Sequence, residues 1–296
     1  MCAIFSRPQS DLELVESGVV PRGWLYSIGG GIYLQSRDVE KFLQPDGLPG
    51  PGLSTGDRPQ TLSSACAVLG LTRTLFGGVK LKFVSDLRVG EKLRAEDSNE
   101  SVRMTQSAAS GAMAITTVMR RIFSGDRLVL EQRQTDVIRG PPRATTESGS
   151  TISGDKQKQT KKKPLAPSDT TWRSSFRPYE VSLFSYSALT FNRHRIHYDA
   201  HWAEDVEGYP GIMVHGPFVM QLCIDFIRDR HPGKTLAELE MRAMQPLFVN
   251  QEIVIVGKPV DKGSGCLVWA LCPDGTVAQE VRAIFEEERP LDRARL

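Results

Sequence analysis

Residues 217–230 read PFVMQLCIDFIRDR, are followed by HPG, and decide the fold of this chain. Pro217 suits the first turn of a helix, and the apolar residues after it recur at helical spacing. The HPG segment ends the helix. Strand-like runs follow at 239–244, 252–260, 266–272 and 276–286. A long helix followed by an antiparallel meander predicts a sheet wrapped around a central helix.

The first half of the chain shows the same kinds of element. The pattern predicts strands at 79–85, 91–104, 112–123 and 127–138, and a helix at 61–75. Segments of the two halves also echo each other in the same order: DLRVGE at 86–91 resembles PLFVNQE at 246–252, and GDRLVLE at 125–131 resembles DGTVAQE at 274–280. An offset of about 150 to 160 residues indicates duplicated domains rather than a solenoid.

A polar segment separates the two halves. Residues 141–170 are rich in Pro, Ser, Thr, Gly and Lys and hold almost no apolar side chains. Such a segment cannot bury enough surface to offset its ordering entropy, so we expect a flexible linker. The predicted organisation is a first domain at 1–140, this linker at 141–170, and a second domain at 171–296.

Composition excludes several classes of protein. The 296 residues are 40% hydrophobic and 24% charged, with a formal net charge of +2, which favours a globular protein and no nucleic-acid partner. No apolar run reaches the roughly 20 residues of a membrane span. The five cysteines are scattered without a CxxC pair, and no cysteine lies beside the histidines. We therefore expect free thiols, no zinc site, and no metal or redox cofactor.

The segment FNRHRIHYD at 191–199 gathers the polar chemistry of the chain. All five histidines lie in the second half, and three of them (His194, His197 and His201) fall within eight residues. The second segment, GYPGIMVHGP at 208–217, leads into the predicted helix. Histidines can move protons, and free N–H groups at a helix start can hold a developing oxyanion. Together they suit acid–base chemistry on an activated carbonyl compound.

Both segments resemble the active-site signature of the double hot-dog hydratases and dehydratases. That group includes mesaconyl-CoA hydratase, the type 2 hydroxyacyl-thioester dehydratases and, more distantly, the MaoC-like enoyl-CoA hydratases. The resemblance covers most of the chain outside the linker and the first 20 residues or so. It implies an α+β fold of two antiparallel sheets, each wrapped around a central helix, with a non-catalytic first half.

His197 is the expected acid–base residue, because an imidazole can take and return a proton near neutral pH. MaoC-like hydratases carry Asp-x-Asn-Pro-x-His, and with His197 as the final residue the aspartate position falls on Asn192. This is a departure from the pattern, because an amide can orient water but cannot accept its proton. Closer relatives resemble this chain in Asn-x-His-x-Ile-His, which implies a site built on Asn192 and His197. The Gly216 N–H is expected to stabilise the oxyanion.

Other residues of the two segments have more than one expected role. Asp199 can accept a hydrogen bond from an imidazole, in place of the missing carboxylate, or can cap the turn at 200–204. His215 can donate to the substrate or fix the turn before the helix. Tyr209 is expected in the pocket wall, and Arg195 near a substrate carboxylate or CoA phosphate. The substrate-binding set we predict is His215, Tyr209, Asp199, His194 and Arg195.

These features predict a hydro-lyase that adds water to an enoyl thioester, or removes it from a 3-hydroxyacyl thioester, with an acyl-CoA as substrate and partner. The alternative functions are a hot-dog thioesterase and a non-catalytic acyl-CoA-binding subunit. The chain is also a candidate to form a homodimer. The ending Ala294-Arg295-Leu296 resembles the Ser-Lys-Leu peroxisomal address. Acidic residues near the start of the chain argue against a mitochondrial leader. A peroxisomal location is therefore predicted, with the cytoplasm or mitochondrion as alternatives.

Overall fold

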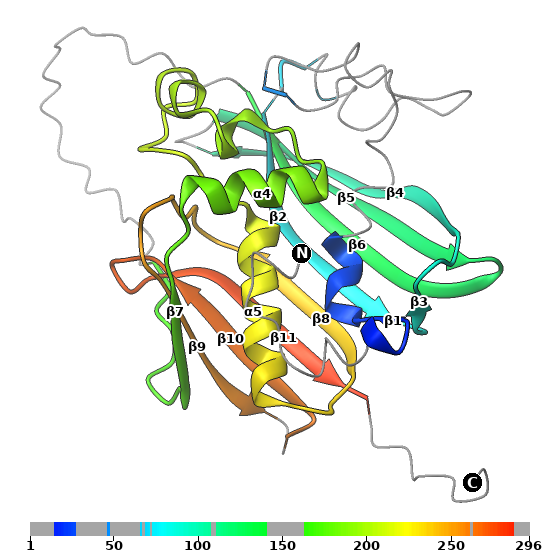
Figure 1. The fold of residues 1–296 in the computed structure, drawn as a ribbon. Helices are drawn as coiled ribbons and strands as arrows, with labels where there is room; N and C mark the ends of the chain where they lie inside the picture. The colour runs from blue at the N-terminus through cyan, green and yellow to red at the C-terminus, as the bar shows by residue number, and fades with distance from the viewer. Residues whose placement is uncertain are drawn as a thin grey trace, which may run out of the picture.

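A single long helix, α5 (Gly216–Arg230), crosses a nine-stranded antiparallel sheet in the computed structural model (Figure 1). The structure describes residues 15–27, 46–47, 66, 69–71, 73–107, 111–140, 163–260 and 263–286. The first-half elements are β1 (Val19–Val20), η1 (Arg22–Trp24), β2 (Arg73–Phe83), β3 (Leu87–Arg88), β4 (Leu93–Ser107), β5 (Gly111–Ser124) and β6 (Arg127–Arg139). The second-half elements are β7 (Trp172–Phe176), α4 (Glu180–Thr190), η3 (Arg195–His197), η4 (Trp202–Val206), α5, β8 (Leu236–Ala243), β9 (Ile253–Val260), β10 (Gly265–Leu271) and β11 (Val277–Phe285).

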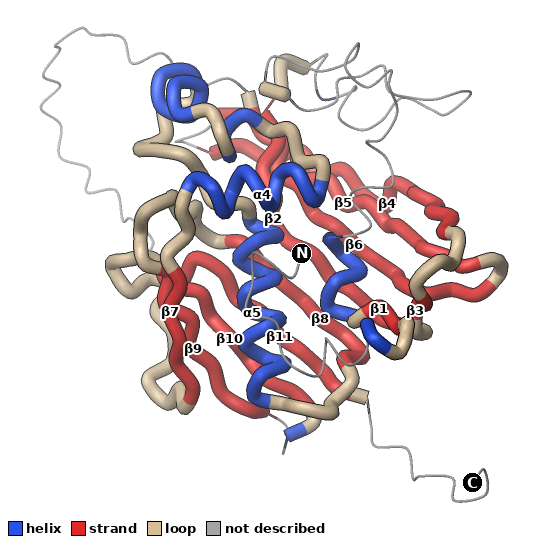
Figure 2. Tube along the Cα trace, in the orientation of Figure 1, coloured by secondary structure: helices blue, strands red, loops and turns tan. Residues whose placement is uncertain are grey.

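The two halves join edge to edge in the sheet. Its strand order is β4-β5-β6-β2-β8-β11-β10-β9-β7, so β2 of the first half pairs with β8 of the second. This junction is antiparallel and sets Leu81 opposite Leu239. The helices α4, α5 and η1 lie on one face of the sheet, as Figure 2 shows. The fold is the expected double hot-dog, but the expected two sheets are continuous because hydrogen bonding across β2 and β8 fuses them.

Helix α5 is buried on nearly every side. Phe218, Cys223, Ile224 and Ile227 are fully buried in the main hydrophobic core, together with side chains from β8 to β11. The segment η1 packs against α5, and a side-chain carbon added at Gly23 would lie 2.5 Å from Ile224 Cγ2. This close approach requires glycine. Full burial explains why so many positions of the helix are apolar.

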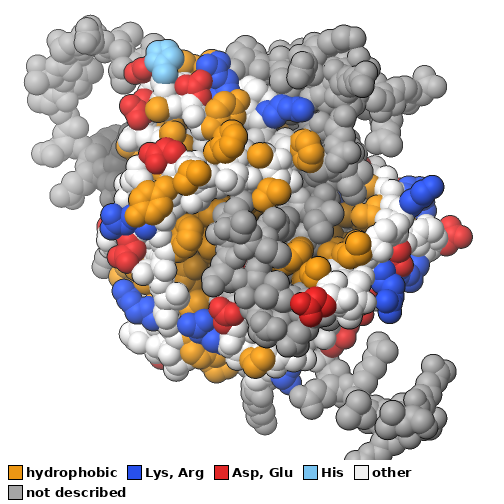
Figure 3. Space-filling model, in the orientation of Figure 1, with side chains coloured by type: hydrophobic (Ala, Val, Ile, Leu, Met, Phe, Trp, Pro, Cys, Tyr) orange, Lys and Arg blue, Asp and Glu red, His pale blue; other side chains and the backbone are white. Residues whose placement is uncertain are grey.

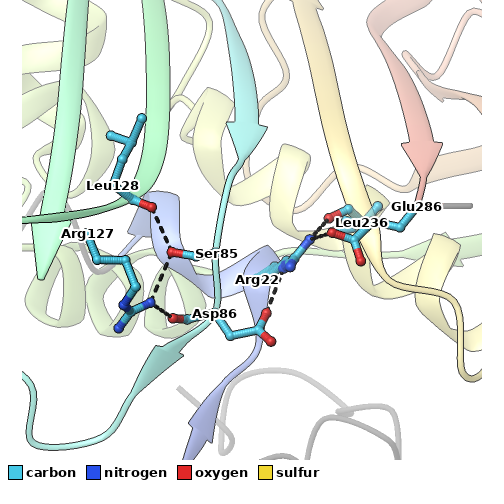
Figure 4. A network of polar contacts seen from close by, with 7 residues as sticks. All are labelled: Arg22, Ser85, Asp86, Arg127, Leu128, Leu236 and Glu286. Carbon is cyan, nitrogen blue, oxygen red and sulfur yellow. Dashed lines mark hydrogen bonds and ion pairs between the residues drawn. The ribbon is translucent and has the colours of Figure 1, made fainter. Parts of the chain in front are cut away.

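Arg22 ties the start of the chain to both halves (Figure 4). Its Nε donates to Asp86 Oδ1 at 2.9 Å, beyond the end of β2. Its Nη1 donates to the Leu236 carbonyl at 2.8 Å and to Glu286 Oε1 at 2.7 Å. Because the Arg22 side chain is only 9% exposed, these charge-assisted bonds replace the water it loses on folding.

The strands predicted from sequence are confirmed with shifts of a few residues at their ends, and the helix predicted at 217–230 corresponds to α5. Part of the first-half prediction is wrong. The helix expected at 61–75 falls mostly outside the described residues, but its end at 73–75 lies in β2. There Arg73, Thr74 and Leu75 pair with Arg139, Ile138 and Val137 of β6.

The predicted linker falls mostly outside the described residues, since 141–162 are not described. Its last part is attached to the second half: Val277 N–H donates to the Pro164 carbonyl at 2.9 Å, and Lys258 pairs with Asp169. Pro164 and Asp169, which fall within the predicted linker, therefore contact the second half. The division into two domains on either side of it stays a prediction.

Helix α4 was not predicted, because its sequence EVSLFSYSALT lacks a clear apolar stripe. Leu183 and Tyr186 face the core, whereas Val181 and Phe184 are more than 60% exposed. Figure 3 shows hydrophobic side chains gathered among charged ones on the face that carries α4 and α5. The described part of the chain contains no helix long and apolar enough to span a membrane.

Candidate active site

A cavity of about 490 Å³ lies where the start of α5 meets β2 and β6. Both halves of the chain line it. Second-half residues of the lining include Asn192, His194, His197, Tyr209 and Gly216. First-half residues of the lining include Tyr26, Phe76, Gln134, Asp136 and Arg139. The polar segment singled out in the sequence and the first-half sheet therefore form one site.

The polar segment is held in place by its own backbone turns. Phe191 ends α4 in the left-handed conformation, with φ of 53°. Asn192 Oδ1 accepts a hydrogen bond from the His194 backbone N–H at 3.0 Å, which leaves the amide group to donate. A first-half residue packs tightly here, since a side-chain carbon at Gly47 would lie 2.1 Å from the Arg193 carbonyl oxygen. Asn192 is therefore oriented as a hydrogen-bond donor in the cavity lining.

His197 is buried and has a defined tautomer. Its Nδ1 lies 2.8 Å from the Met213 carbonyl oxygen, which can only accept, so Nδ1 carries the proton. The Nε2 atom of His197 then carries a free lone pair, and His197 lines the cavity. Burial lowers the pKa of His197 to about 4, despite the hydrogen bond to Met213, which raises it. The sequence suggested an ordinary histidine pKa, but the structure gives a neutral base at pH 7.

His215 lies behind His197 and outside the cavity lining. Its ring stacks on that of His197, with centroids 3.7 Å apart and an angle of 20° between the planes. Its Nε2 lies 2.8 Å from Ser187 Oγ on α4, and burial lowers its pKa well below the usual value. Of the two expected roles, this position fits the one that fixes the turn, and the substrate contact stays a prediction.

His194 lines the cavity beside His197, with the two rings edge to face at 5.5 Å. Its Nε2 lies 4.0 Å from Asp46 Oδ2. Burial, with smaller contributions from the nearby His197 and Arg73, lowers the pKa of His194 to about 3. His194 is therefore neutral at pH 7, and its contact with Asp46 is not a charged pair.

The start of α5 presents the predicted oxyanion site. His215 is the N-cap residue, Gly216 is the first helical residue, and Pro217 has no N–H. Both Phe218 and Val219 donate to the His215 carbonyl. The Gly216 N–H is therefore the amide that the helix start offers to the cavity, at the positive end of the helix dipole.

Glycine at position 216 is also required for packing. A side-chain carbon there would lie 2.7 Å from Phe76 Cδ1 and 3.6 Å from Gln279 Nε2. Gln279 donates to the Gly216 carbonyl at 3.1 Å. The helix start is thus set against β2 on one side and β11 on the other.

Tyr209 connects the cavity to two first-half arginines. Its hydroxyl accepts from Arg139, and from Arg73 at 3.4 Å. Arg73 also forms an ion pair with the buried carboxylate of Glu207. Arg73 and Arg139 are direct cross-strand neighbours, an arrangement that costs energy unless the charges are offset. The phenol and Glu207 supply that compensation, and Tyr209 is among the residues that line the cavity.

Asp199 and Arg195 lie outside the cavity lining, and their predicted substrate contacts stay predictions. Arg195 Nη2 is 2.6 Å from Asp199 Oδ2, and its guanidinium stacks on Trp202 at 4.2 Å. Asp199 Oδ1 accepts from the Trp202 backbone N–H at 3.0 Å. This is the capping role, one of the two that the sequence left open for Asp199.

Sequence analysis missed the first-half side of the cavity, although a signal was present. On β6, residues Leu130, Gln132, Gln134, Asp136 and Ile138 share one face by strand alternation. The outer two are buried apolar residues, whereas the middle three are polar. Polar residues at core positions of a strand indicate a functional site. Within the described ranges, no group of three or more His, Cys, Asp or Glu residues could hold a metal ion.

The fold and the cavity define a double hot-dog protein, and solved structures agree. A MaoC-like dehydratase from Phytophthora capsici superposes with a TM-score of 0.59 and 15% identity, over 92% of this chain and 95% of that one. A Mycobacterium tuberculosis protein described as having a double hot-dog fold gives a TM-score of 0.50 and 12% identity, over 93% and 92% of the two chains. At these identities, the likeness shows the fold alone.

Sequence comparison identifies the family. The model for hydroxyacyl-thioester dehydratase type 2 matches residues 37–249. The mesaconyl-C(4)-CoA hydratase of Chloroflexus aurantiacus is 31% identical over 206 residues, which cover 70% of this chain and 68% of that protein. The mitochondrial hydroxyacyl-thioester dehydratase type 2 of Schizosaccharomyces pombe is 37% identical over 82 residues, or 27% of each chain. The chain belongs to the hydroxyacyl-thioester dehydratase type 2 family, a family of hydro-lyases.

Proposed function

We propose that this enzyme interconverts an enoyl-CoA and a 3-hydroxyacyl-CoA, with His197 as the acid–base residue. The observation that carries the proposal is the neutral His197 in the cavity, its Nε2 unprotonated because Nδ1 bonds the Met213 carbonyl. A neutral imidazole removed from water can take the proton next to a thioester carbonyl. Family membership and the names of the relatives support the same reaction class.

In the dehydration direction, the proton on C2 passes to His197 Nε2. Negative charge then develops on the thioester oxygen, where the Gly216 N–H and the α5 dipole stabilise it. The C3–O bond breaks as the C2–C3 double bond forms, and the departing oxygen needs one proton to leave as water. Asn192 lines the same cavity and can donate to that oxygen, while protonated His197 can return the proton.

The experiment follows absorbance at about 260 to 280 nm, where conjugated enoyl thioesters absorb. Wild type and His197→Ala are incubated with a panel of enoyl-CoAs and 3-hydroxyacyl-CoAs of different chain length and charge. His201→Ala is the matched control, because His201 is exposed and pairs only with Asp205 among the contacts of the described residues. The proposal is supported if the absorbance changes with wild type and with His201→Ala, and if the rate of that change is about 10²- to 10⁴-fold lower with His197→Ala.

Thiol release in the same reactions measures thioesterase activity. Thiol release without a change in the enoyl absorbance would show that the enzyme is a thioesterase and not a hydratase. Tight binding of acyl-CoA with neither signal would make the protein a non-catalytic binding subunit. The panel also tests CoA as the carrier, because the family is named for a thioester without a stated carrier.

We also propose a peroxisomal location, from the Ala294-Arg295-Leu296 ending, which lies outside the described residues. The fungal relatives are named as mitochondrial proteins, which favours the mitochondrion as the alternative. A fluorescent protein fused ahead of residue 1, with and without the last three residues, distinguishes the two locations. The predicted homodimer is checked separately by sedimentation of the purified chain.

A further inference from the structure

We propose that Asp136, from the first half of the chain, is a second catalytic acid in the cavity that holds His197. This inference rests on the proposed hydratase/dehydratase function. Its carboxylic acid would donate the proton that turns the departing 3-hydroxyl into water. His197 would then act only on the C2 proton.

The position of Asp136 supports this role. Asp136 lines the same cavity as His197, Asn192 and Gly216. It is the direct cross-strand neighbour of Phe76, so the two side chains stand roughly 5 Å apart on one face of the sheet. The Phe76 ring in turn lies against Gly216 at the start of α5. Asp136 is therefore one side chain away from the predicted oxyanion site, on the opposite wall from the polar segment.

A chain of side-chain amides holds the Asp136 carboxyl. Gln132 Nε2 donates to Gln134 Oε1 at 3.2 Å, and Gln134 Nε2 donates to the two Asp136 oxygens at 3.0 and 3.1 Å. The Tyr26 hydroxyl also donates to Gln134 Oε1, at 3.1 Å, which fixes the orientation of that amide. These bonds bring a single donor nitrogen, Gln134 Nε2, to the two Asp136 oxygens, and they leave the remaining lone pairs of the carboxyl, or its proton, for a group in the cavity.

The electrostatic surroundings keep the carboxyl proton available. In the described part of the chain, no Lys or Arg forms an ion pair with Asp136, and its burial raises its pKa to about 6. Arg120 on β5 and Tyr26 interact electrostatically with Asp136, and the titratable or charged residues that line the same cavity are His194, His197, Tyr209 and Arg139. Gln134 and Arg120 lower the pKa, but burial outweighs them. An unpaired carboxyl in a cavity with a neutral histidine has the properties of a proton donor.

The proposed step balances in protons and electrons. The C2–H bond breaks, its proton moves to His197 Nε2, and its electron pair forms the C2–C3 double bond. The C3–O bond breaks, its electron pair leaves with the oxygen, and the oxygen takes the Asp136 proton to become water. The proton on His197 then returns to the Asp136 carboxylate through the cavity. Hydration is the reverse, and both directions require one proton shared by the His197–Asp136 pair.

This requirement gives a pH signature that His197 alone does not give. The Asp136 acid form is lost as pH rises through about 6, so kcat/KM should fall toward tenfold per pH unit above that value. If His197 worked alone, activity would stay level above its pKa of about 4. The two mechanisms therefore differ over an accessible pH range.

The experiment measures kcat and KM between pH 5 and 9 for wild type, Asp136→Asn and Asp136→Glu, on a thioester that wild type turns over. We expect Asp136→Asn to lower kcat about 10²-fold or more with a small change in KM, and to lose the alkaline decline. Asp136→Glu should regain part of the rate and the decline. Glu100→Gln is the control, since Glu100 is an exposed residue of β4 that pairs with Arg133.

Two results would overturn the role of Asp136. One is a kcat for Asp136→Asn equal to that of wild type. The other is a lower kcat for Asp136→Asn whose kcat/KM still falls above about pH 6, which would indicate a structural effect. A wild type inactive on every thioester, with correct folding shown by circular dichroism, would overturn the proposed function and this inference with it. Activity in wild type with an unaffected Asp136→Asn would leave the proposed function standing and remove only the inference.

Discussion

The imidazole rings of His197 and His215 stack 3.7 Å apart, nearly parallel, in the interior of the protein. Such a stack opposes protonation of both rings at once, because two buried positive charges at this distance repel strongly. The His197 Nδ1–H bond to Met213 and the His215 contact with Ser187 hold the rings in place. We therefore propose that His215 is a positioning residue, which holds the His197 ring in its orientation at the cavity.

The first prediction concerns this positioning. His215→Ala should lower kcat about 10- to 100-fold with little change in KM, because His197 loses the ring that fixes its orientation. His215→Phe should recover part of kcat, since a phenyl ring can stack without the bond to Ser187. Steady-state kinetics with His201→Ala as a control checks this. Equal kcat in wild type and His215→Ala would show that the stack has no role in catalysis.

The second prediction concerns acid stability. His194, His197 and His215 all have lowered pKa values, so below pH 6.5 the unfolded chain binds protons that the folded chain resists. The contribution of these neutral histidines to the free energy of unfolding is complete above pH 6.5. It is lost progressively as pH falls from there through the lowered pKa values, about 4 for His197 and about 3 for His194. Asp136 acts in the opposite sense, because its raised pKa makes the folded state take up a proton between pH 6 and 4. The free energy of unfolding should therefore fall by at most about 3 kcal/mol per pH unit in this window.

Urea denaturation at pH 7.0, 6.0 and 5.0 measures this slope. His194→Gln should make it shallower, because one of the three histidines no longer titrates, whereas His201→Gln should leave it unchanged. A stability independent of pH between 7 and 5 would contradict the assignment of buried, neutral histidines.

The third prediction concerns the packing of the oxyanion site. Gly216→Ala places a carbon 2.7 Å from Phe76 Cδ1, so we expect a loss of about 1 to 3 kcal/mol in the free energy of unfolding and a lower kcat. The double variant with Phe76→Leu should recover part of both, because the smaller side chain makes room. A double-mutant cycle on unfolding and kcat tests this, and strictly additive effects would show that the two residues do not meet.

The fourth prediction separates stability from activity. Arg22→Met removes bonds to Asp86, Glu286 and the Leu236 carbonyl, and should cost about 2 to 4 kcal/mol of stability. Since these contacts lie at the opposite end of α5 from Gly216, kcat per folded molecule should not change. Arg94→Met, in an exposed pair with Glu96, should cost less than about 1 kcal/mol. Similar losses in the two variants would argue against Arg22 as the link between the halves.

The second half was predictable from sequence because its signals are local. The apolar stripe of 217–230, the Pro217 start and the polar run around His197 each depend on neighbouring residues. The contribution of Asp136 depends on which strands of the two halves pair, since β2 and β8 must join before Asp136 can face the start of α5. The polar face of β6 was visible in the sequence, but only the packing shows that it opens into the His197 cavity.

Proton and oxygen exchange tests the central claim most directly, that His197 moves a C2 proton while water is added to or lost from the acyl chain. A 3-hydroxyacyl-CoA that wild type dehydrates is equilibrated with the enzyme in D₂O containing ¹⁸O and analysed by mass spectrometry. The account predicts deuterium at C2 and ¹⁸O at C3 with wild type, and neither label above background with His197→Gln. Equal labelling by His197→Gln, or release of free acid with no label at C2, would contradict it.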